Sequence, residues 1–186
     1  MQIPAERRSE TGATTDTAAC VDRVARTGFT RGVIQPKWRL SHAQGYLGLG
    51  MVAEAAAELD HIPAPARDAV EVLALRMAVL QEQQDWPALR AVAGDFVRHT
   101  PGEPAAWVTW AYATRRADSL DGAEKILLEA ERLHAGEPTI QFNLGCYACQ
   151  RGDLVEARRR VDRAIALDQT FSELAATDPD LAPLRV

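Results

Sequence analysis

The sequence of 186 residues has little that could crosslink the chain, insert it into a membrane or direct it to secretion. Its three cysteines are an odd number, which argues against a disulfide framework. A secretory signal needs a basic start followed by an apolar stretch of about 7–15 residues, whereas this chain is polar through Thr17. No apolar run approaches the roughly 18 residues of a membrane span. We therefore expect a soluble, cytoplasmic protein without a membrane partner.

Aromatic residues make up only 6% of the sequence, and lysine occurs twice against 19 arginines and 33 alanines. The formal net charge is −5, which argues against nucleic acid as a partner because phosphate binding favours a basic surface. Alanine is the best helix former, so its excess predicts an all-α protein with closely packed helices. The length fits one domain, or a small domain with a tail.

An internal repeat of 34 residues organises most of the chain. The segment Leu154-Val-Glu-Ala157 is matched at that spacing by Leu120-Asp-Gly-Ala123. We expect a mobile N-terminal segment with a short capping helix over Asp16–Arg26, then the repeats, then a capping tail. The predicted divisions are an N-terminal segment 1–35, a repeat domain 36–171 made of units 36–69, 70–103, 104–137 and 138–171, and a C-terminal capping tail 172–186.

Each unit is predicted to form two helices. Gly152 is a natural terminator after a first helix. The first unit departs most from the pattern, because Gly45 and Gly48 weaken its first helix and Pro63 ends its second helix early. Side chains that can cap the second helices are Asp85, Ser119 and Asp153. Small residues that would let the two helices of a unit approach closely are Ala123, Ala130, Ala157 and Ala164.

Further residues recur in step with the period. Trp107 lies sixteen residues before Ala123, Leu144-Gly145 occupies a first helix, and Pro101 stands near the end of a unit. Together with the 34-residue period they resemble the tetratricopeptide repeat (TPR). The resemblance implies a right-handed α-solenoid of about four helix-turn-helix repeats, whose first helices line a concave groove. It also implies a non-catalytic module, without a cofactor, that binds a peptide or protein in that groove.

By analogy with that family, spaced positions on each first helix are expected to line the groove. Tyr112 and Arg116 could anchor an aromatic group or a carboxylate of the partner. The alternative is that Arg115 and Arg116 are merely solvated at a helix C-terminus, where the helix dipole favours positive charge. The expected groove residues are Ser41, Gln44, Leu75, Ala78, Glu82, Val108, Thr109, Tyr112, Arg115, Arg116, Phe142, Asn143, Cys146 and Gln150.

One subtype of the family binds the C-terminal carboxylate of a chaperone peptide. It uses a lysine four residues before an asparagine, with more Asn, Lys and Arg on later helices. Here Lys37 is followed four residues later by Ser41, and Asn143 is the one asparagine of the sequence. We therefore do not expect a partner of that class.

The motif Cys146-Tyr-Ala-Cys149 allows two interpretations, packing within a helix or a redox pair or half of a zinc site. Zinc needs four ligands, and no second pair lies at a suitable spacing, so we favour packing and expect no metal site. The four histidines lie far apart in the sequence, without ligand spacing. A basic patch is either a solvated face or a phosphate contact, and it consists of Arg158, Arg159, Arg160 and Arg163.

The favoured function is a non-catalytic adaptor or scaffold for a peptide or protein. One alternative is a small TPR-type chaperone for a secreted or assembling protein. Another is a thiol redox or metal accessory protein that uses Cys146 and Cys149. We also expect the tail to fold over the last helix and some self-association through the ends of the solenoid, giving a homo-oligomer. The apolar residues of the tail are Phe171, Leu174, Leu181 and Leu184.

Overall fold

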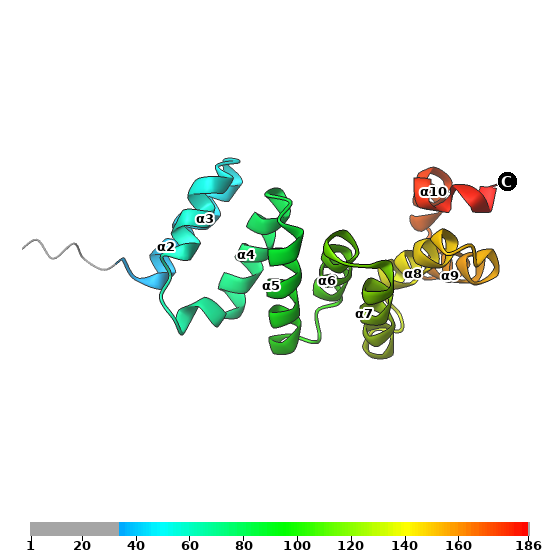
Figure 1. Ribbon diagram of the computed structural model, residues 1–186, viewed down its shortest axis with the longest axis horizontal. Coiled ribbons are helices and arrows are strands. Elements are labelled where there is room, and N and C mark those ends of the chain that lie inside the picture. Colours follow the sequence, from blue (N-terminus) through cyan, green and yellow to red (C-terminus); the bar gives the residue numbers. More distant parts are fainter. Residues whose placement is uncertain (1–33, 186) are drawn as a thin grey trace, which may run out of the picture. The chain divides into compact units, whose positions relative to one another are not determined.

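The computed structural model describes residues 34–185, and all regular secondary structure within them is helical. Gln35–Val186 forms one compact unit, in which α2 to α9 are arranged in chain order (Figure 1). The capping helix expected over Asp16–Arg26 lies outside the described residues. The elements are α2 (Pro36–Gly48), α3 (Val52–Asp60), η1 (Ala66–Asp68), α4 (Val70–Glu82), α5 (Trp86–His99), α6 (Pro104–Ala117), α7 (Leu120–Leu133), α8 (Pro138–Gln150), α9 (Leu154–Leu167), α10 (Phe171–Thr177) and η2 (Pro179–Arg185).

Four helix pairs, α2–α3, α4–α5, α6–α7 and α8–α9, follow the 34-residue period. Their first helices begin at Pro36, Val70, Pro104 and Pro138. Proline suits a first helical turn, because its missing N–H would have no partner there and its φ is already helical. The all-α prediction is confirmed for the described residues. Within residues 34–185, no helix combines the length and apolar character needed to cross a membrane.

Local signals in the sequence set the helix ends. Asp85, Ser119 and Asp153 each accept a hydrogen bond from the backbone N–H three residues later, at 3.1 Å in all three cases, so the predicted N-caps are confirmed. Gly152 adopts a φ of 83° in the turn between α8 and α9. In the first unit, α3 ends at Asp60, before Pro63, as expected.

Small residues allow the helices of a pair to approach closely. Gly145 of α8 lies directly against α9. A Cβ atom built on Gly145 would be 2.9 Å from Cγ2 of Val161 and 3.3 Å from the carbonyl oxygen of Ala157. The alanines that recur on the second helices are fully buried, namely Ala123, Ala130, Ala157 and Ala164.

The buried apolar residues form two clusters. The larger one runs from α4 to η2 and contains most of the bulky core residues, including Trp107 and Tyr147. The smaller one lies in the first helix pair and the adjoining face of α4, around Leu59, Ile62 and Val72. Each unit therefore buries its apolar face against its neighbours, as stacked two-helix units must.

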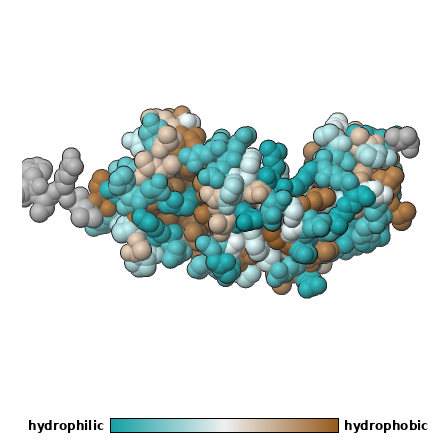
Figure 2. Space-filling model, viewed as in Figure 1, coloured by the Kyte–Doolittle hydropathy of each residue, from teal (hydrophilic) through white to brown (hydrophobic). Residues whose placement is uncertain are grey.

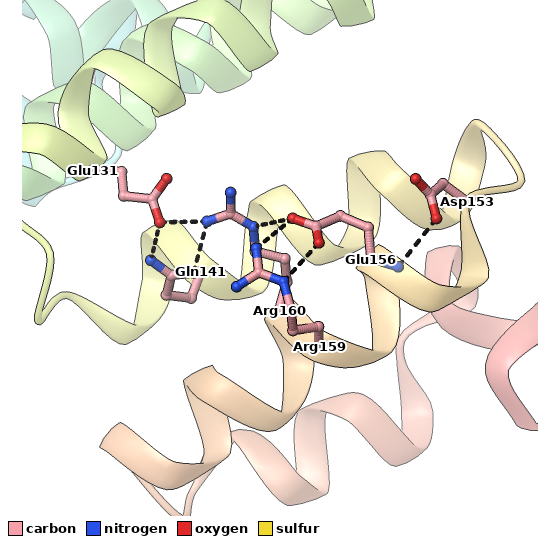
Figure 3. A network of polar contacts seen from close by, with 6 residues as sticks. All are labelled: Glu131, Gln141, Asp153, Glu156, Arg159 and Arg160. Atoms are coloured by element: carbon pink, nitrogen blue, oxygen red, sulfur yellow. Dashed lines mark hydrogen bonds and ion pairs between the residues drawn. The ribbon is translucent and has the colours of Figure 1, made fainter.

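A network of polar side chains joins α7, α8 and α9 (Figure 3). Arg160 of α9 is 8% exposed, and its guanidinium bonds to the carboxylates of Glu131 and Glu156 and to Oε1 of Gln141. Gln141 also donates from Nε2 to Oε1 of Glu131 at 2.8 Å. Burial alone would raise the pKa of Glu131, but the hydrogen bonds from Gln141 and Arg160 outweigh it and lower the pKa. The network ties the last unit to the unit before it.

The C-terminal segment, formed by α10 and η2, turns back over α8 and α9 (Figure 1). Leu181 is 1% exposed and belongs to the larger core cluster. Phe171 packs its ring against α8. Asp180 pairs with Arg115 of α6, with 2.9 Å between the nitrogen and oxygen atoms. The segment therefore covers part of α8 and reaches α6, in addition to covering the last helix.

Candidate functional site

Three open hollows lie along α4. One hollow, of about 520 Å³, lies between α2 and α4, and another, of about 320 Å³, lies between α4 and α6. Ala74 lines both, so the two hollows adjoin across α4. The third, of about 450 Å³, lies at the C-terminal end of α4, where Ala78 and Glu82 line it. We call these three hollows together the α4 trough.

One face of α4 lines most of the trough, and Val70, Met77 and Gln81 complete its α4 side. Glu71, Ala74, Leu75, Ala78 and Glu82 fall within about 100° of one another around the helix axis. Leu75 is half-buried and the other four are exposed. This face is thus a short apolar floor with a glutamate at each end. Figure 2 shows hydrophobic residues interspersed among hydrophilic ones across the visible face of the protein.

Several residues expected in the groove line the trough. Gln44, Leu75 and Ala78 border the hollow between α2 and α4, and Thr109 borders the hollow between α4 and α6. Glu82 borders the third hollow. Ser41 is exposed on α2, and Val108 is half-buried on α6.

An aromatic and cationic cluster stands on α6 and the start of α5. The ring of Tyr112 meets the ring of Trp86 edge to face, with 5.4 Å between centroids. The guanidinium carbon of Arg116 lies 5.0 Å from the centroid of the Trp86 ring. Tyr112 remains 40% exposed. Sequence reasoning missed Trp86, because it begins a second helix and the groove was assigned to first helices only.

The part of the expected groove on α8 is covered. Phe142 and Cys146 are buried, and the ring of Phe142 lies 5.2 Å from that of Phe171 in the C-terminal segment. These two residues are therefore not open to a partner in this conformation, contrary to the sequence-based expectation. Asn143 is partly buried, and its amide donates to a backbone oxygen of its own helix at 2.8 Å. Gln150 is exposed at the end of α8.

Arg115, also expected in the groove, is engaged within the chain. Besides its ion pair with Asp180, its guanidinium carbon lies 5.5 Å from the centroid of the Tyr147 ring. Burial by itself would lower the pKa of Arg115, but the hydrogen bond from its guanidinium to Asp180 outweighs this effect and the pKa is raised. The C-terminal segment thus neutralises this cation.

Cys146 and Cys149 are buried free thiols on α8. Burial raises the pKa of the Cys146 thiol to about 12, and it also raises the pKa of Cys149. A reactive cysteine needs a lowered pKa and access to solvent, and these two have neither. Within residues 34–185, no group of three or more His, Cys, Asp or Glu side chains is arranged to hold a metal ion.

The basic patch on α9 is largely engaged by the protein itself. Arg159 and Arg160 bond to Glu156, at 2.6–2.7 Å, and Arg158 donates to the carbonyl oxygen of Leu184. Arg163 is exposed. The patch is therefore mainly a set of intramolecular contacts between α9, the preceding helices and the C-terminal segment.

Comparisons with known proteins place the fold. No protein-family model matches the sequence, and no curated protein sequence does. Among solved structures, MamA 41-end from Desulfovibrio magneticus RS-1 matches with a TM-score of 0.66 at 16% identity, over 85% of this chain and 98% of that one. MamA MSR-1 C2 matches with a TM-score of 0.66 at 16% identity, over 82% of this chain and 87% of that one. YrrB, described as a TPR protein with an unusual peptide-binding site, gives 0.57 at 12% identity, over 78% and 80%.

These likenesses, together with the four helix pairs, define an α-solenoid of the tetratricopeptide-repeat type. The fold class predicted from the 34-residue period is confirmed. At identities of 12–17% the likeness concerns the fold, so the function has to be argued from the trough itself.

Proposed function

We propose that this protein is a non-catalytic interaction module that binds a peptide or a protein segment in the α4 trough. The observation that carries the proposal is the trough itself. Three hollows adjoin along α4, and their floor is made of small and apolar residues that no element within residues 34–185 covers. Binding would consist of shape complementarity and burial of apolar surface, with polar contacts at the rim.

Two further observations support this proposal. YrrB, which shares the fold, is described as having a peptide-binding site. The trough is also lined mainly by side chains that cannot serve as nucleophiles or general bases, apart from glutamates, Thr100 and Thr109. A chaperone for an assembling protein would use the same trough and differ in its partner alone. A thiol redox role is disfavoured by the burial and raised pKa of Cys146.

The test is to compare the partners retained by wild-type protein and by Ala74→Trp in a quantitative pull-down. Ala74 is exposed and lines two of the hollows, so tryptophan would fill them without disturbing the core. The matched control is Ala166→Trp, at an alanine on α9 that is also exposed and lies outside the trough. We expect Ala74→Trp to lose partners that the control retains. Equal retention by both variants would refute the trough as the binding site.

A second variant tests the neighbouring cluster. The double substitution Tyr112→Ala and Arg116→Ala removes the side chains that contact Trp86 on the same side of the solenoid. A partner that extends from the trough onto α6 should be retained less well. Loss with Ala74→Trp but full retention with the double variant would limit the site to α2 and α4.

A further inference from the structure

The charges of the α4 trough indicate the kind of segment it binds, and this inference rests on the proposed function. Glu71 and Glu82 stand at the two ends of the exposed α4 face, with Ala74, Leu75 and Ala78 between them. Glu82 lies eleven positions after Glu71, which places the two glutamates about 16 Å apart along the helix axis. An apolar floor with a negative charge at each end is complementary to an apolar face with a positive charge at each end.

Three arginines of α2, α4 and α6 are engaged by carboxylates of the chain itself. Within residues 34–185, no cation forms an ion pair with Glu71 or Glu82. Arg116 lies over the Trp86 ring. The three ion pairs, each at 2.9 Å, are Arg39–Glu58, Arg76–Asp60 and Arg115–Asp180.

The last of these pairs matters most for the choice of ligand. Arg115 would have made the α6 end of the groove attractive to an acidic segment, but Asp180 of the C-terminal segment occupies it. Asp180 thus takes the position beside Arg115 that a carboxylate of a partner would occupy. The hollows of the trough are instead lined by Glu71, Glu82 and Glu103, the last of these on the α6 side.

The position of Glu82 at the end of α4 also favours a basic ligand. It lies in the last turn of α4, where the partial negative charge of the helix terminus disfavours a carboxylate. Glu71, by contrast, lies in the first turn, where a carboxylate is favoured without any ligand. A cation bound beside Glu82 would remove an unfavourable interaction that the described part of the chain leaves uncompensated.

We infer that the α4 trough binds a helical segment of a partner protein that carries an apolar face and two basic side chains about eleven residues apart. The apolar face would lie over Ala74, Leu75 and Ala78, whose small or half-buried side chains admit a second helix, as in other helix-in-groove complexes. Its Lys or Arg side chains would pair with Glu71 and Glu82. An extended segment would instead need basic residues about five apart to span the same distance.

A displayed library of helical peptides of about 16 residues tests this. The apolar face is kept as Ala and Leu, and two polar positions eleven residues apart are randomised among Lys, Glu and Gln. The library is selected on the full chain, with Ala74→Trp as the blocked control. Enrichment of Lys at both positions is the expected result. Enrichment of Glu, or no preference for charge, overturns the inference but leaves the proposed function standing. No enrichment over the blocked control overturns both.

Matched charge variants complete the test. Glu71→Gln with Glu82→Gln should weaken binding of the enriched Lys peptide roughly 2- to 30-fold, the range expected for two solvent-accessible ion pairs. The control is Glu54→Gln with Glu129→Gln, which makes the same charge change at exposed positions of α3 and α7 outside the trough. Higher salt should reduce the difference. Equal weakening by both double variants would mean that net charge alone acts, and it would overturn the inference.

Discussion

The contact between Gly145 and α9 gives the sharpest stability prediction. A methyl group added by Gly145→Ala would lie 2.9 Å from Cγ2 of Val161, closer than carbon atoms approach without displacement, and 3.3 Å from Cβ of Arg160. Overpacking of this kind costs about 1–3 kcal/mol. Replacing glycine by alanine inside a helix returns about 1 kcal/mol through helix propensity. The net change in the free energy of unfolding should be a loss of roughly 0–2 kcal/mol.

Gly45→Ala is the matched control. Gly45 also lies inside a first helix, but a Cβ atom there would meet nothing within 4 Å. It should gain about 0.5–1 kcal/mol, so urea denaturation should separate the two variants by about the cost of the clash. In a Val161→Ala background, Gly145→Ala should lose most of its cost, giving a coupling of about 0.5–3 kcal/mol. Equal stabilisation by both glycine substitutions would refute the reasoning.

Three further predictions concern the C-terminal half. Hydrogen bonds from Arg159 and Arg160 lower the pKa of Glu156 from its ordinary 4.5 to about 2, so their stabilising effect is complete above about pH 4.5 and is lost as the pH falls towards 2. Urea denaturation across this range should show a shallower decline for Glu156→Gln than for wild type, and parallel declines would contradict the pairing. In a Cys20→Ser background, the buried Cys146 and Cys149 should react with a thiol reagent far more slowly than in the unfolded chain, and deletion of residues 171–186 should speed the reaction. Fast labelling of the undeleted protein would show that the C-terminal segment does not cover α8. Arg160→Met should lower the free energy of unfolding by about 1–3 kcal/mol, since it leaves Glu131 and Gln141 without their cation, and an unchanged denaturation midpoint would show that the network contributes nothing.

The covering of α8 by the C-terminal segment could not be predicted from the sequence. Phe142 and Cys146 occupy first-helix positions that line the groove in a regular repeat, so the sequence placed them there. Whether they are open depends on the C-terminal segment, which turns back over α8. The Arg115–Asp180 pair joins residues 65 positions apart, a distance over which periodicity carries no information. The tail was expected over the last helix, yet it also covers α8, and Leu174 of the tail remains 50% exposed.

The sequence by itself determined the helices and their order. The 34-residue period, the caps at Asp85, Ser119 and Asp153, and the buried alanines of the second helices act through interactions within a few residues or between adjoining helices. Such interactions depend on local spacing, which can be counted along the chain. Only the tertiary structure decided which first-helix positions the C-terminal segment covers and which charges within residues 34–185 pair with one another. The physical reason is that the contacts of Arg115 with Asp180, and of Arg160 with Glu131 and Gln141, join side chains from different elements, whose meeting depends on the path of the whole solenoid.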